Sequence, residues 1–133
     1  MNYLLDTHII IWALTNSKSI SDEVRNIILD RNNNIFFSAI SPWEVEIKHQ
    51  KHADFKLTGN QLMFLCDQAY YNFLPISERH IAELEKIKKI DDNVIHNDPF
   101  DKMLLAQAKA EDMLLITHDK KMLYYNFDDV IYV

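Results

Sequence analysis

Short apolar runs alternate with amphipathic segments along this chain, and this alternation constrains the fold more than any other feature. The runs that predict strands are rich in branched and aromatic side chains, and they cover residues 2–6, 35–39, 73–76, 113–117 and 130–133. The segments that predict helices cover residues 7–14, 21–30, 41–52, 60–71, a stretch that begins at 77, and 98–110. Strands that alternate with helices favour a mostly parallel sheet covered on both faces. We therefore predict an α/β fold.

The length and composition predict one domain, residues 1–133, because 48% of the residues are hydrophobic and can form a sizeable core. The single cysteine, Cys66, excludes an intrachain disulfide. The longest apolar run, 9–14, is far shorter than the roughly 20 residues that span a bilayer. No basic leader precedes the first strand. We expect a cytoplasmic protein without a membrane segment.

Four acidic residues are expected at one edge of this sheet. Asp6 ends the first strand, and Asp119 follows the strand 113–117. The helix of Asp101 leads into that same strand and runs antiparallel to it, so its first turn lies at the same edge. Glu44 comes a few residues after the second strand leaves the sheet. Functional groups of open α/β sheets gather at the carboxyl ends of the strands, so we expect the four carboxylates to be neighbours.

Helix starts offer a structural alternative for two of these acids. Asp98 precedes Pro99, a residue suited to the first helical position, so Asp98 is predicted to be an N-cap. Asp101 then falls at the third helical position. Ser41, also followed by a proline, repeats this pattern ahead of Glu44. Taken alone, each of these two acids could complete a capping box or serve a function.

Clustered carboxylates need cations or protons, because two of them about 4 Å apart repel by roughly 4 kcal/mol at an effective dielectric of 20. Oxygen ligands without cysteine or clustered histidine favour Mg²⁺ or Mn²⁺ over Zn²⁺. Two such ions would reduce the net charge of −6 to −2 (−6 + 4). A metal-activated water suits phosphodiester hydrolysis. The predicted metal ligands are Asp6, Glu44, Asp101 and Asp119, with Asp98, Thr7 and Thr117 as supporting residues around them.

The net charge disfavours broad nucleic-acid binding by a basic surface, but it leaves room for a local basic patch. Candidate phosphate contacts are Lys48, Lys51, Lys102 and Lys120, each of which could equally be a surface lysine.

Histidines near the acids fit no zinc motif. The spacing of His8, His96 and His118 is not that of zinc ligands, so we expect them to be hydrogen-bonded within the fold or exposed. Trp12 and Trp43 are expected to pack in the core.

Four segments of the chain resemble the ribonuclease toxins of VapC type in the PIN-domain family, in order and spacing: LLDTHIIIWAL, SAISPWEVEIK, HNDPFDKMLLAQA and LLITHDKKM. The resemblance implies a three-layer α/β/α fold and a Mg²⁺- or Mn²⁺-dependent endoribonuclease that a cognate antitoxin inhibits, on a dimer. The acidic positions of that family fall on Asp6, Glu44, Asp101 and Asp119, with Asp98 as an adjacent acid and Thr117 as the hydroxyl before the last aspartate. Asn97 stands where an arginine is common, which removes one possible RNA contact.

We predict a metal-dependent endoribonuclease that acts as the toxin of a toxin–antitoxin pair and cleaves RNA. One alternative is a Mg²⁺-binding phosphoacceptor signalling domain, which would need paired acids after the first strand, where this chain has only Asp6. Another is a PIN-like module that binds RNA or protein without cutting it. The apolar side chains of the helix 60–71 are expected to form core or a homodimer face.

Overall fold

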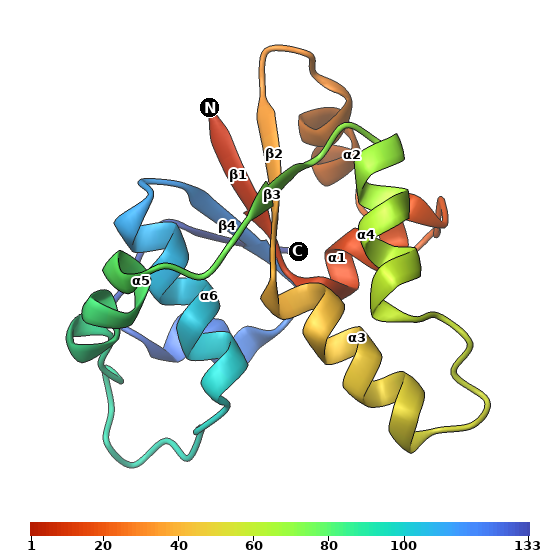
Figure 1. The fold of residues 1–133 in the computed structure, drawn as a ribbon. Coiled ribbons are helices and arrows are strands. Elements are labelled where there is room, and N and C mark those ends of the chain that lie inside the picture. Colours follow the sequence, from red (N-terminus) through yellow and green to blue (C-terminus); the bar gives the residue numbers. More distant parts are fainter.

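The computed structural model describes residues 1–133 and contains one five-stranded sheet. Its strands are β1 (Asn2–Leu5), β2 (Asn34–Ser38), β3 (Asn72–Leu74), β4 (Leu114–Thr117) and β5 (Val130–Tyr132). They lie in the order β3-β2-β1-β4-β5, and all neighbouring pairs are parallel (Figure 1). The expected strands and the parallel sheet are therefore confirmed.

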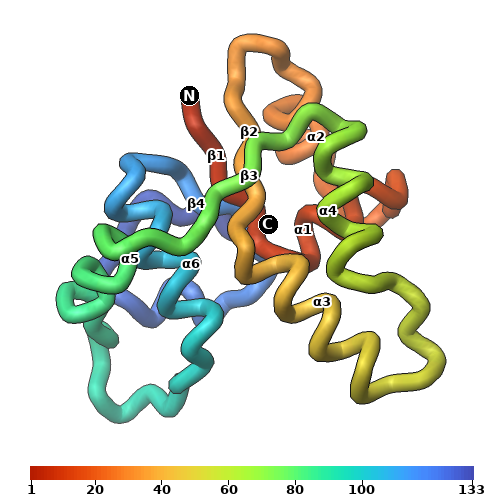
Figure 2. The backbone as a smooth tube through the Cα atoms, in the orientation of Figure 1, coloured from red at the N-terminus to blue at the C-terminus, as the bar shows by residue number.

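Helices cover both faces of this sheet, as the ribbon and the backbone tube show (Figures 1 and 2). They are α1 (Thr7–Leu14), α2 (Asp22–Leu29), α3 (Ile40–Lys51), α4 (Gly59–Gln68), α5 (Glu78–Glu83) and α6 (Pro99–Ala110), with short 3₁₀ helices η1 (Leu84–Lys86) and η2 (Lys120–Tyr124). None of the helices combines the length and the apolar composition that crossing a lipid bilayer requires.

Alternate side chains of the strands supply two separate cores, which makes the fold three-layered. In β1, Leu4 packs in a cluster with Leu104 and Leu105 of α6. Tyr3 and Leu5, which point to the opposite face, belong to a second cluster formed with α1, α2, α3 and α4. Each buried leucine contributes roughly 1.5–3 kcal/mol through the hydrophobic effect. The α/β/α architecture is confirmed.

The sheet order reverses at β1, which has β2 on one side and β4 on the other. Such a switch point leaves a crevice at the carboxyl ends of the strands. The ends of β1 and β4 lie side by side there, since Leu5 is paired with Ile116 and the Asp6 N–H donates to the Ile116 carbonyl. Asp6, the first of the predicted acids, therefore lies at the centre of this edge of the sheet.

The start of α3 differs from the prediction that Ser41 is its cap. The helix begins at Ile40, whose N–H donates to the Ser38 hydroxyl at 3.0 Å, so the serine at the end of β2 holds the turn. Ser41 is fully buried within the helix and hydrogen-bonds the Thr7 hydroxyl instead. Glu44 consequently lies beyond the first turn of α3.

The α4 helix lies largely in the segment 60–71, which is expected to form core or a homodimer face, and it has both buried and exposed apolar side chains. Leu62 and Cys66 are completely buried in the second core cluster. Met63, Phe64 and Leu65 are exposed, with Phe64 at 61%.

Candidate active site

Asp6 links the end of β1 to the start of α1 and is almost fully buried. One carboxylate oxygen accepts the Ile9 N–H at 3.1 Å and so caps α1. The other accepts the hydroxyl proton of Thr117, at the end of β4. Burial raises the pKa of Asp6, although these hydrogen bonds act in the opposite direction. Thr117 thus holds the Asp6 carboxylate directly.

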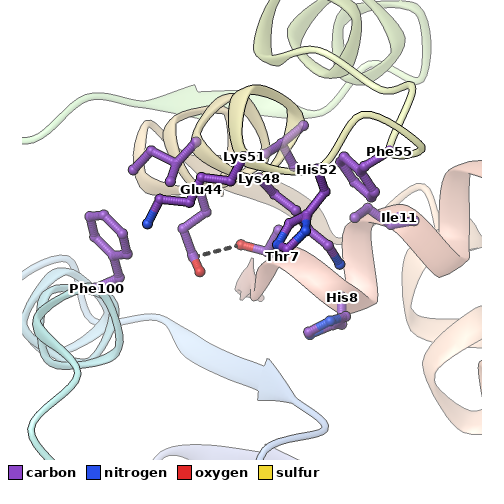
Figure 3. A pocket seen from close by; sticks show the side chains of 11 residues that line it. Thr7, His8, Ile11, Glu44, Lys48, Lys51, His52, Phe55 and Phe100 are labelled. Atoms are coloured by element: carbon purple, nitrogen blue, oxygen red, sulfur yellow. Dashed lines mark hydrogen bonds between the residues drawn. The ribbon is translucent and has the colours of Figure 1, made fainter.

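Glu44 projects from α3 toward the same edge. Its Oε1 accepts the Thr7 hydroxyl at 2.9 Å (Figure 3). The Thr7 oxygen also lies 2.9 Å from the Ser41 hydroxyl. Burial raises the pKa of Glu44, and the charges of Asp98 and Asp6 raise it further. Thr7 therefore fixes the orientation of Glu44, as Thr117 fixes that of Asp6.

The first turn of α6 carries two acids with different contacts. Asp98 accepts the N–H groups of Phe100 at 2.9 Å and Asp101 at 3.4 Å, and Pro99 occupies the first helical position. The predicted N-cap is confirmed. The Asp101 carboxylate does not complete a capping box; its Oδ2 instead lies 3.1 Å from His96 Nε2.

The pKa of Asp101 is affected by the other acids at this edge of the sheet. It is raised to about 7, first by burial and then by the charges of Asp98, Asp119, Glu44 and Asp6. Because like charges act appreciably only over short distances, the fold has brought all of these carboxylates near Asp101. Asp6, Glu44 and Asp119, which the topology is expected to bring to this edge, all contribute to this shift.

Asp119 follows β4 directly and is only partly buried. Its N–H donates to the Thr117 hydroxyl at 3.0 Å, and its Oδ1 accepts the Lys121 N–H at 3.0 Å. Asp101, Asp119 and His96 each offer a ligand atom, and these three atoms lie within 4.8 Å of one another. Asp6 and Glu44 lie outside this compact group.

His96 and Tyr125 are the residues that the sequence reasoning did not assign to the site. His96 is 7% exposed, and its Nδ1 lies 2.8 Å from the hydroxyl of the fully buried Tyr125. The HNDPFD segment places a histidine two residues before the cap, but only the fold brings in Tyr125. His8 and His118 are exposed. The expectation that the three histidines are hydrogen-bonded or exposed is confirmed.

A cavity of about 430 Å³ opens beside Glu44 and is lined by Thr7, Lys48, Lys51 and Phe100 among others (Figure 3). Two of the four candidate lysines thus line the same cavity as Glu44. The Lys48 ammonium is 4.6 Å from the centre of the Phe55 ring.

The other two candidate lysines lie elsewhere around the acids. Lys102 follows Asp101 in α6 and is partly buried, whereas Lys120 is exposed at the start of η2. None of the four lysines forms an ion pair with a carboxylate.

Trp43 corrects the prediction that both tryptophans are core residues. Its side chain is 53% exposed and packs edge-on against Phe100, with ring centroids 4.9 Å apart. The buried residues of α3 are Ile40, Ser41, Pro42 and Val45, so Trp43 lies on a part of the helix surface that the core does not cover. Trp12 is partly buried against the second core cluster, in agreement with the prediction.

A parallel α/β sheet with an acidic cluster at its switch point defines a small class of proteins, and comparison with known families identifies which one. The sequence model of the PIN domain matches residues 3–128. The chain therefore belongs to the PIN domain family.

Solved structures with the same fold include toxin–antitoxin complexes. VapBC2 from Rickettsia felis, bound to a DNA fragment from its promoter, has a TM-score of 0.70 at 18% identity, with 100% of this chain and 98% of that chain covered. VapBC-1 from nontypeable Haemophilus influenzae has a TM-score of 0.64 at 23% identity, with 92% and 90% covered. A toxin–antitoxin complex from Klebsiella pneumoniae has a TM-score of 0.61 at 20% identity, with 97% and 95% covered. No curated protein matches the sequence significantly.

The sheet order also separates this protein from the phosphoacceptor alternative. Signalling domains of the CheY type have the order 2-1-3-4-5, whereas the strands here follow 3-2-1-4-5. Together with the PIN match, this difference argues against that alternative.

Proposed function

We propose that this protein is a metal-dependent endoribonuclease that acts as the toxin of a toxin–antitoxin pair. The observation that carries the proposal is the convergence of the acids around Asp101, which raises the pKa of that carboxyl to about 7. Nuclease activity is the general activity of the PIN family.

The proposed metal ligands are the carboxylates of the four acids at the sheet edge: Asp6, Glu44, Asp101 and Asp119. Their oxygen donors fit Mg²⁺ or Mn²⁺, and mutual repulsion would be relieved by divalent charge. When bound, such an ion supplies an activated water for in-line attack on a phosphodiester. The chain itself orients the ligands, since Thr117 donates to Asp6 and Thr7 donates to Glu44.

The RNA substrate would lie over the cavity beside Glu44. Lys48 and Lys51 project from α3 into its lining, where ammonium groups can contact phosphates (Figure 3). Lys102 and Lys120 extend the proposed phosphate contacts around the acidic cluster.

The proposed partner is a cognate antitoxin that inhibits the nuclease. The similarly folded structures from R. felis, H. influenzae and K. pneumoniae are toxin–antitoxin complexes, which supports this assignment. The proposal further includes a single domain over residues 1–133, a homodimer and a cytoplasmic location.

Cleavage of a total RNA pool by the purified, antitoxin-free protein tests the nuclease. We expect cleavage with Mn²⁺, none with a chelator, and loss of at least about a hundredfold for Asp6→Asn or Asp101→Asn. Asp54→Asn, which changes an exposed acid, is the matched control. Activity that survives Asp101→Asn would refute the catalytic assignment, and an inactive wild type on every RNA would favour the module that binds without cutting.

A further inference from the structure

The hydrogen bonds of Tyr125 define which nitrogen of His96 carries a proton. The Tyr125 hydroxyl donates to the His96 carbonyl at 2.9 Å, so its only proton is engaged. The same oxygen lies 2.8 Å from His96 Nδ1 and must therefore accept the Nδ1 proton. A neutral imidazole has one protonated nitrogen. In the neutral ring, Nε2 therefore presents a lone pair.

That lone pair faces two carboxylates. Nε2 lies 3.1 Å from Asp101 Oδ2, and one ligand atom from each of His96, Asp101 and Asp119 lies within 4.8 Å of the other two. A lone pair and an ionised oxygen at this distance repel each other unless a cation or a proton joins them. The ring cannot turn away, because it is buried and held at Nδ1.

The three groups come from two separate parts of the chain. His96 lies in the segment before α6, Asp101 in the first turn of α6, and Asp119 directly after β4. A histidine that binds a metal through one ring nitrogen usually donates the N–H of the other nitrogen to an acceptor that fixes the ring. The Tyr125 hydroxyl is in the place of that acceptor at His96 Nδ1.

We propose that His96 Nε2 is a nitrogen ligand for the divalent ion held by Asp101 and Asp119, with Tyr125 positioning the ring. This inference rests on the proposed function and adds a donor that is not a carboxylate. Imidazole binds transition ions more readily than Mg²⁺, which prefers oxygen. The preference of this site for Mn²⁺ over Mg²⁺ is therefore stronger than that of a site formed by four carboxylates alone.

Pulsed electron paramagnetic resonance of the Mn²⁺-loaded protein tests this ligand without an activity measurement. We expect a hyperfine coupling from a directly bound nitrogen in the wild type and its loss in His96→Gln. Calorimetry should show that His96→Gln weakens Mn²⁺ binding by at least about tenfold, while Mg²⁺ binding changes less. His49→Gln, which alters a histidine of α3 that does not line the cavity beside Glu44, is the matched control.

Tyr125→Phe separates ring positioning from folding, because it keeps the aromatic ring and removes only the hydroxyl. We expect Mn²⁺ binding about tenfold weaker, with a weaker nitrogen coupling. If Mn²⁺ binding depends on Asp101 but shows no nitrogen coupling, His96 is not a ligand and the proposed metal site itself stands. His96 would then be a protonated partner of Asp101. Mn²⁺ binding that is unaffected by Asp101→Asn would overturn the proposed metal site itself.

Discussion

At the scale of single residues, Asp98 and Asp101 show how one helical turn serves both folding and chemistry. Asp98 accepts two N–H groups at the start of α6, whereas the carboxylate of Asp101 faces the acidic cluster. We expect Asp98→Ala to lower the free energy of unfolding by about 0.5–2 kcal/mol, because the cap is lost. Asp98→Asn should retain most of this stability, since asparagine also caps helices. Urea denaturation measures both, and equal stability of Asp98→Ala and the wild type would contradict the capping role.

Replacement of Asp101 should raise stability, whereas replacement of Asp98 by alanine should lower it. The folded pKa of Asp101, about 7, lies above the ordinary value of 3.8, so the folded state favours the protonated form and loses stability as pH rises between these values. In metal-free buffer at pH about 8, we therefore expect Asp101→Asn to raise the melting temperature. The increase should be roughly 2–8 °C for each kcal/mol by which the free energy of unfolding rises. The difference should shrink as the pH is lowered toward about 4. A melting temperature lowered equally at both pH values would contradict this account.

At the scale of elements, the helices and strands were largely predictable because their hydrophobic periodicity agrees with their end signals. The proline after Asp98 marked the start of α6 correctly. The same pattern failed at Ser41, since Ser38 holds the preceding turn and the helix starts earlier. A local motif does not reveal which of two nearby serines the tertiary structure uses.

The exposed apolar side chains of α4 give a prediction for assembly. Phe64 is 61% exposed between two other exposed apolar residues, while Leu62 and Cys66 are in the core. If α4 forms the dimer face, Phe64→Ser should convert a dimer to a monomer in light scattering, whereas Ile90→Ser, which changes another exposed residue, should not. A wild-type mass that stays monomeric at all concentrations would exclude the homodimer.

At the scale of the whole molecule, the parallel sheet explains why acids far apart in sequence become neighbours. A parallel sheet with functional groups at the carboxyl ends of its strands was predictable, and with it the expectation that Asp6, Glu44, Asp101 and Asp119 gather at one edge. The contact of His96 with Tyr125 was not predictable, because it depends on how the chain after β4 packs against the segment before α6. No periodicity or motif records such a long-range packing contact.

The central claim is that the acidic cluster holds a divalent ion, and thermal unfolding with and without Mn²⁺ tests it most directly. A ligand that binds only the folded state stabilises it by about 2.7 kcal/mol at a concentration one hundred times its Kd. We predict that Mn²⁺ raises the melting temperature of the wild type and of Asp54→Asn, but leaves that of Asp101→Asn nearly unchanged. Equal shifts for the wild type and Asp101→Asn, or no shift for any of the three proteins, would contradict the claim.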